Sequence, residues 1–137
     1  MLAYSQITEF SGQMGDFRVK VHRKSRFVDA SKCTACGACA EKCPTRVPNE
    51  FNFGLDERKA IYKDYAQGIP SQFTIDPEHC RVMQGQKCGV CAKVCQAKAI
   101  DYEMKDSDVE LNVASVIIST GYELFESRRA TKVLLVP

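Results

Sequence analysis

Eight cysteines are the residues of this sequence best suited to chemistry, and they form two groups of four. The first group lies in the unbroken run CTACGACAEKCP (33–44), which has the spacing CxxCxxCxxxCP. Cysteines at every third position can wrap a tight loop around one cubane and point three thiolates at three irons, while small residues between them let backbone amides approach the sulfurs. The run therefore predicts ligands for a [4Fe-4S] cluster.

The second group keeps the CxxCxxxC part of this spacing at Cys88, Cys91 and Cys95, but Cys80 lies further upstream. Seven residues separate Cys80 from Cys88 where the first group has two, and Gln96 stands where a proline is expected. A longer loop still delivers the same thiolate, because closing a few more residues costs only on the order of 1 kcal/mol in chain entropy. We interpret this group as a lengthened version of the same motif.

The fourth cysteine of such a run ligates the other cluster in ferredoxins that carry two clusters. Applied here, this rule divides the eight cysteines into two complete sets and leaves none over. The predicted sets are Cys33, Cys36, Cys39 and Cys95 for the first cluster, and Cys80, Cys88, Cys91 and Cys43 for the second. Because every cysteine is committed, and no nucleophile with a base and no Walker phosphate loop is found, no catalytic residue is predicted.

Two zinc sites with four thiolates each are the alternative explanation of the cysteines. Structural zinc usually joins two CxxC-type knuckles from separate loops, whereas four cysteines within eleven residues crowd one short segment, which favours clusters. The histidines carry weaker predictions. His79, next to Cys80, could donate a hydrogen bond to a cluster sulfur, but a capping or surface role explains it better. His22 needs no function.

Short elements must hold these motifs in place. Apolar and polar residues alternate over 17–21 and 26–28, which predicts a hairpin of short strands around the basic run at 22–26. Between the cysteine groups, DERKAIYKDYA (56–66) contains good helix formers and predicts a helix, ended by the glycine and proline that follow it. The stretch VELNVASVIIS (109–119) predicts a returning strand that ends at a Thr-Gly pair.

The expected fold class is therefore α+β, a bacterial-type two-[4Fe-4S] ferredoxin fold with a helical insertion, flanked by short antiparallel strands. Three parts are expected along the chain. They are an N-terminal strand and hairpin segment at 1–30, a double [4Fe-4S] ferredoxin domain at 31–104, and a return strand with a poorly ordered tail at 105–137.

Composition narrows the remaining classes of function. Among the 137 residues, 19 Lys and Arg against 17 Asp and Glu give a formal net charge of only +2, which offers no reason to expect binding to nucleic acid. No apolar run approaches the roughly 20 residues of a membrane-spanning helix, and the first residues do not resemble a signal peptide. We therefore expect a cytoplasmic protein without membrane insertion, in which reduced cysteines bind metal rather than form disulfides.

Three stretches of the sequence resemble the A-type subunit of heterodisulfide reductase. They are SKCTACGACAEKCPTRVPNEFN (31–52), KAIY (59–62) and CGVCAKVCQAKAI (88–100), within a resemblance that runs from about Tyr4 to Gly121. In that family a double-cubane ferredoxin module is inserted into a flavoprotein of the thioredoxin-reductase type, which relays electrons. The resemblance implies that this chain is an electron carrier by itself and part of an oxidoreductase complex, with other subunits of that type, a flavoprotein or a hydrogenase as partner.

The resemblance also implies a role for the flanks of the module. Residues 17–28 and 116–121 resemble strands of the flavin domain on either side of the insertion. FAD belongs to the full-length family and is not expected on this chain, because the Gly-rich dinucleotide turn of such flavoproteins is missing near its start. After about Arg129 the tail departs from the family, so we expect a truncated, interrupted or split gene product.

The leading hypothesis is an iron–sulfur electron-transfer module, a fragment of the A-type heterodisulfide reductase subunit that relays electrons between flavin and partner subunits. A free-standing two-cluster ferredoxin is the second hypothesis, and a zinc-stabilised interaction module is the third. Metal content separates the third hypothesis from the other two. Binding to flavoprotein or cysteine-rich subunits separates the first from the second.

Overall fold

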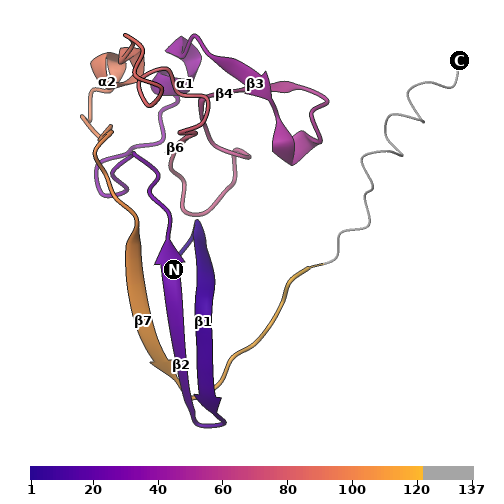
Figure 1. Ribbon diagram of the computed structural model, residues 1–137. Helices are drawn as coiled ribbons and strands as arrows, with labels where there is room; N and C mark the ends of the chain where they lie inside the picture. The colour runs from indigo at the N-terminus through magenta and orange to yellow at the C-terminus, as the bar shows by residue number, and fades with distance from the viewer. Residues whose placement is uncertain (122–137) are drawn as a thin grey trace, which may run out of the picture.

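The computed structural model of the chain describes residues 1–121, in which an elongated sheet leads into a body of short elements around the cysteines (Figure 1). The predicted tail after Arg129 lies outside these residues. The sheet is antiparallel, has the order β1-β2-β7, and consists of β1 (Ser5–Gln13), β2 (Asp16–Arg23) and β7 (Ser107–Val113). The body contains α1 (Ala38–Lys42), β3 (Arg46–Pro48), the 3-10 turn η1 (Glu50–Asn52), β4 (Glu57–Lys59), β5 (Ile61–Tyr62), β6 (Thr74–Ile75) and α2 (Val90–Val94).

The predicted antiparallel strands are confirmed, but the hairpin turns at a different place. The chain reverses between Gln13 and Asp16, and a side chain at Gly12 would collide with the Asp16 carbonyl oxygen, so this turn requires glycine. The basic run at 22–26 is not the turn, since it begins inside β2. The second predicted strand, 26–28, is reduced to a single bridge between Val28 and Ile100.

A row of apolar side chains sets the register of the sheet. Val19 in the central strand lies opposite Phe10 on one side and Leu111 on the other, so the three share one face. Val19 is 6% exposed, whereas Phe10 on the edge strand is 53% exposed. A shift of one residue would move this row to the opposite face, so the apolar pattern fixes which residues pair. The returning strand predicted at 109–119 follows this pairing as β7, but it ends at Val113.

The helix predicted at 56–66 is wrong, because β4 and β5 occupy this stretch. Between these strands, the Ala60 amide donates to the Thr45 carbonyl over 3.3 Å, and the Ala60 carbonyl accepts from the Asp76 amide over 2.8 Å. Ile61 pairs with Ile75 of β6, and both side chains are buried. These contacts with distant parts of the chain use backbone groups that a helix would need for itself, so tertiary pairing overrides local helix propensity.

The core of the body is built partly from the cysteines themselves. Its buried members are Val28, Cys39, Ile61, Phe73, Ile75, Cys80, Cys91 and Ala99. The helices α1 and α2, one from each cysteine motif, pack against each other. Within residues 1–121, neither helix has the length and apolar character needed to cross a membrane.

His22 in the central strand β2 contacts a pair of carboxylates, one in the edge strand β7 and one just before it. Its Nδ1 lies 2.8 Å from Asp108 Oδ1, directly across the strand pair, and its Nε2 lies 3.1 Å from Asp106 Oδ2. Asp106 also accepts a hydrogen bond from the Ser25 amide over 2.7 Å, where the sheet leads into the body. The hydrogen bonds to Asp108 and Asp106 raise the pKa of His22. Protonated His22 therefore acts as a clamp: through Asp106 and Ser25 it links the end of the sheet that is nearest the body to the body itself.

This clamp predicts a stability that falls as the pH rises. Because the folded-state pKa of His22 is raised, its contribution is fully present below the ordinary histidine pKa of about 6.5 and is lost as the pH rises through the raised value. Melting temperatures of the metal-loaded protein measured between pH 6 and 8 should fall with pH, and His22→Asn should remove part of that fall. An identical slope in His22→Asn would contradict the clamp.

Candidate functional site

Among the described residues, two cavities are lined by cysteines, and four of the cysteines line the larger of these two. Its volume is about 270 Å³, and its thiol-bearing residues are Cys33, Cys36 and Cys39 from the first motif and Cys95 from the second. Small residues of the first loop complete one wall, and Val28, Phe73 and Ile100 supply apolar contacts. The cavity thus has thiols on several sides and little else that can bind metal.

The other four cysteines line the second cavity in the reciprocal arrangement. Cys80, Cys88 and Cys91 come from the second motif, and Cys43 comes from the first. The cavity also contacts Ile61 and Ile75 from the core. Its volume is about 20 Å³, roughly the space of one water molecule. The donor set fits a cluster, but the space between the thiols must widen to admit one.

Both cavities depend on the same local backbone conformation. Gly37 before α1 and Gly89 before α2 have φ values of 86° and 89°, in the left-handed region that favours glycine. Each glycine lies between two cysteines of its motif, so the chain turns there and directs both cysteines to one cavity. The two motifs are therefore a structural repeat, as their spacing predicts.

Burial raises the pKa of the innermost thiols. The pKa of Cys39 rises to about 11, chiefly through burial, and the Ala40 amide offsets part of this rise. Burial also raises the pKa of Cys91, as do the charges of Cys80 and Cys43, while a hydrogen bond with Tyr102 lowers it. Metals bind the thiolate, so metal binding at either site must displace protons from these sulfurs.

At the first site, the space between the thiols suits a cluster better than a single ion. Among residues 1–121, no three His, Cys, Asp or Glu side chains converge as ligands of one metal ion. Zinc holds its sulfur ligands at about 2.3 Å, which draws four sulfurs to a point. The thiols of the first site instead surround about 270 Å³, so the donor chemistry and the space both fit a larger group with sulfur bridges between its metals.

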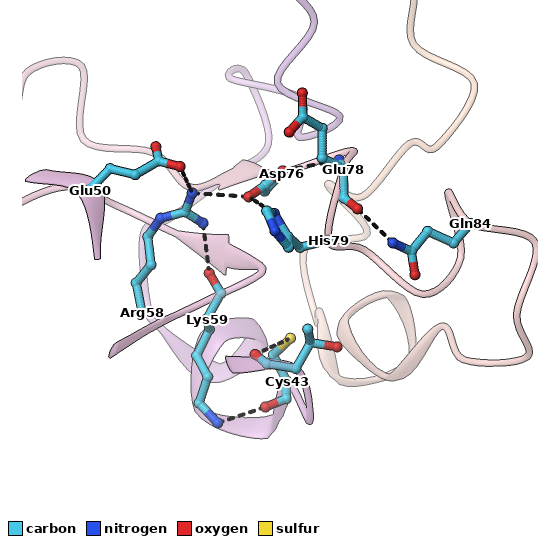
Figure 2. A network of polar contacts seen from close by, with 9 residues as sticks. Cys43, Glu50, Arg58, Lys59, Asp76, Glu78, His79 and Gln84 are labelled. Carbon is cyan, nitrogen blue, oxygen red and sulfur yellow. Dashed lines mark hydrogen bonds and ion pairs between the residues drawn. The ribbon is translucent and has the colours of Figure 1, made fainter. Parts of the chain in front are cut away.

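An ionic network surrounds the buried carboxylate of Asp76, which precedes Cys80 in the sequence (Figure 2). The Asp76 carboxylate accepts from the Arg58 guanidinium over 2.9 Å and contacts His79 Nδ1 at 2.8 Å. Burial alone would raise the pKa of Asp76, but the hydrogen bonds with His79 and Arg58 lower it overall. The Asp76 carbonyl oxygen accepts from the Cys80 amide over 3.0 Å. His79 therefore faces a carboxylate, in line with the structural role that the sequence favoured.

Lys59, which follows Arg58 on β4, contacts the first cysteine motif. Lys59 Nζ donates to the Cys43 carbonyl oxygen over 2.8 Å, and Cys43 Sγ lies 3.8 Å from the Thr45 carbonyl oxygen (Figure 2). Arg58 and Lys59 are consecutive, so one short strand supports both Cys80 and Cys43, which come from different motifs and line the same cavity. The sequence did not predict this support, because its local pattern assigned the stretch to a helix.

Tyr102 is a further residue that the sequence did not identify. Its hydroxyl lies 2.9 Å from Cys91 Sγ, and its ring packs against the core. Burial and the contact with Cys91 raise the pKa of Tyr102, so the hydroxyl keeps its proton at neutral pH. No motif marks this position, because a tyrosine after a cysteine cluster looks like an ordinary core residue.

Comparison with known proteins adds two findings. A family described as "4Fe-4S binding domain" matches residues 26–49, which contain the first cysteine motif. Relatives named as the A-type iron–sulfur subunit of CoB–CoM heterodisulfide reductase match most of this chain. The protein of Methanocaldococcus jannaschii is 42% identical over a match that covers 93% of this chain and 19% of the relative. The second such protein of Methanopyrus kandleri is 49% identical over a match that covers 90% of this chain and 18% of the relative.

A third relative, the A-type subunit of the ferredoxin:CoB–CoM heterodisulfide reductase of Methanosarcina mazei, is 42% identical over 94% of this chain and 16% of its own length. The resemblance expected from the sequence is therefore confirmed. Residues 26–49 match a 4Fe-4S binding domain, and most of the chain is similar to a segment of these A-type subunits. It spans less than a fifth of the length of these curated relatives.

The reciprocal arrangement of the cysteines predicts which site each substitution damages. Cys43→Ser should perturb the cluster held by the second motif and leave the other nearly intact, because Cys43 lines the second cavity. Cys95→Ser is the matched variant and should do the opposite. Electron paramagnetic resonance of the two reduced variants tests this. If Cys43→Ser alters the signal that Cys95→Ser also alters, the crossed assignment is wrong.

The ionic network predicts unequal effects at the two carboxylates that contact Arg58. Asp76→Asn removes the charged partner of the Arg58 guanidinium, whose side chain is only 9% exposed. This variant should lower the free energy of unfolding by roughly 2 kcal/mol and should reduce the iron content of the second site. Glu50→Gln removes a contact at 3.4 Å from a side chain that is 78% exposed, so it should cost less than about 0.5 kcal/mol. Denaturant unfolding with iron analysis measures both effects. Equal losses in the two variants would contradict the network.

Proposed function

We propose that this chain is a two-cluster electron-transfer module of the type found in the A-type heterodisulfide reductase subunit. One cluster is held by Cys33, Cys36, Cys39 and Cys95, and the other by Cys80, Cys88, Cys91 and Cys43. The observation that carries this proposal is the reciprocal lining of the two cavities, each with three cysteines from one motif and the fourth from the other. The matched 4Fe-4S binding domain supports the type of cluster at the first motif.

A [4Fe-4S] cluster supplies a one-electron centre, and the chain sets how that centre is held and shielded. Around the first site, Val28 and Phe73 limit access of water. Around the second, Ile61 and Ile75 do the same. The packing of α1 against α2 keeps the two sites in one body, so an electron can pass between them without movement of separate domains.

The partners belong to the same proposal. The relatives are named as subunits of heterodisulfide reductases, and several of these names include ferredoxin. We therefore expect this module to exchange electrons with the flavin-bearing part or with other subunits of such an assembly. Disulfide reduction is assigned to that assembly, because the proposed ligation would use all eight cysteines of this chain.

The relay role predicts electron transfer without substrate turnover. After anaerobic reconstitution with iron and sulfide, the chain should pass electrons from a low-potential donor to an artificial dye, while FAD stays unbound and an added disulfide stays oxidised. The zinc-loaded chain is the matched control and should reduce no dye. Stoichiometric FAD binding, or disulfide reduction by the chain alone, would overturn the proposal, and so would equal dye reduction by the zinc-loaded chain.

A further inference from the structure

One cysteine sulfur of the second cavity, that of Cys91, contacts a side-chain hydroxyl. Cys39 in α1 and Cys91 in α2 occupy corresponding positions, each the second residue of its helix after a left-handed glycine. Both sulfurs interact with a neighbouring backbone amide, from Ala40 and Ala92 respectively. Only Cys91, among the hydrogen bonds described for residues 1–121, also contacts a side-chain hydroxyl, that of Tyr102 at 2.9 Å.

The direction of this hydrogen bond follows from the state of the sulfur. A free thiol could donate to the tyrosine oxygen, but a cluster-bound sulfur is a thiolate and has no proton to give. Tyr102 must then be the donor. Its ring is partly buried against the core, beside the thiols of the second cavity, so the hydroxyl is held at the sulfur rather than free to turn into solvent.

We propose that Tyr102 tunes the second cluster, raising its reduction potential by donating a hydrogen bond to Cys91 Sγ. This inference rests on the proposed function, because it takes Cys91 as a cluster ligand. Reduction by a low-potential donor adds one electron to the cluster and no proton, and the tyrosine keeps its hydroxyl proton. The added charge is spread partly onto the sulfurs, so a donor at one sulfur stabilises the reduced form more than the oxidised form.

The size of the effect follows from the strength of such bonds. Removing the hydroxyl should disfavour reduction of the second cluster roughly tenfold, which corresponds to a fall of about 59 mV in a one-electron potential. The first cluster should keep its potential, since its ligand Cys39 has only amide contacts among the described residues. The hydrogen bond thus adds to the difference in potential between the two centres, so that a transferred electron favours the second cluster.

Redox titration of reconstituted Tyr102→Phe, followed by electron paramagnetic resonance, tests this inference. The variant keeps the ring and loses only the hydroxyl. The midpoint potential should fall for one cluster, namely the one whose signal Cys43→Ser alters. Tyr62→Phe is the matched control, because Tyr62 is also partly buried but its ring packs under the Arg58 guanidinium, 4.0 Å away, and it should leave both potentials unchanged.

The outcomes separate this inference from the function on which it rests. Intact clusters with unchanged potentials in Tyr102→Phe would overturn the inference alone, as would an equal fall in both clusters or a loss of thermal stability without any shift in potential. A wild-type chain that takes up no iron and sulfide would overturn the proposed function as well. A fall confined to the second cluster supports both.

Discussion

The body of this protein depends on one constraint, that each cavity is complete only when residues from both cysteine motifs meet. Cys95 closes the cavity of the first motif, and Cys43 closes that of the second. The packing of α1 against α2 follows from this exchange, because each fourth cysteine lies at the end of its helix. Three thiols also form part of the buried core, so metal binding and folding of the body are coupled.

The elements around this centre give the two sites different surroundings. The first site is a roomier cavity with mainly apolar walls, whereas the second is close to β4 and to the buried pair of Arg58 and Asp76. The long sheet β1-β2-β7 extends away from both sites (Figure 1). His22 links the end of this sheet to the body through Asp106. Charge and hydrogen bonding thus differ around two sets of four cysteines that are chemically identical, and under the proposed function this difference would distinguish the two clusters.

Sequence patterns predicted the local structure of this chain where the chemistry of the cysteines sets the residue spacing. They failed where contacts between distant parts of the chain determine the local structure. The spacing around Gly37 and Gly89 predicts two similar turns, and the structure has them; the ligation itself stays a prediction. The antiparallel strands were predictable from alternation, but 56–66 was not, because pairing of Ile61 with Ile75 outweighs its helix formers. The contact of Tyr102 with Cys91 depends on packing that no local pattern encodes.

The central claim is that the eight cysteines hold two cubanes. The most direct measurement is the iron and acid-labile sulfide content of the anaerobically reconstituted chain, together with its electron paramagnetic resonance spectrum after reduction. We predict iron and sulfide in equal amounts, sufficient for two [4Fe-4S] clusters, and signals from two interacting centres. Iron for one cluster only, or zinc in place of iron without sulfide, would contradict it.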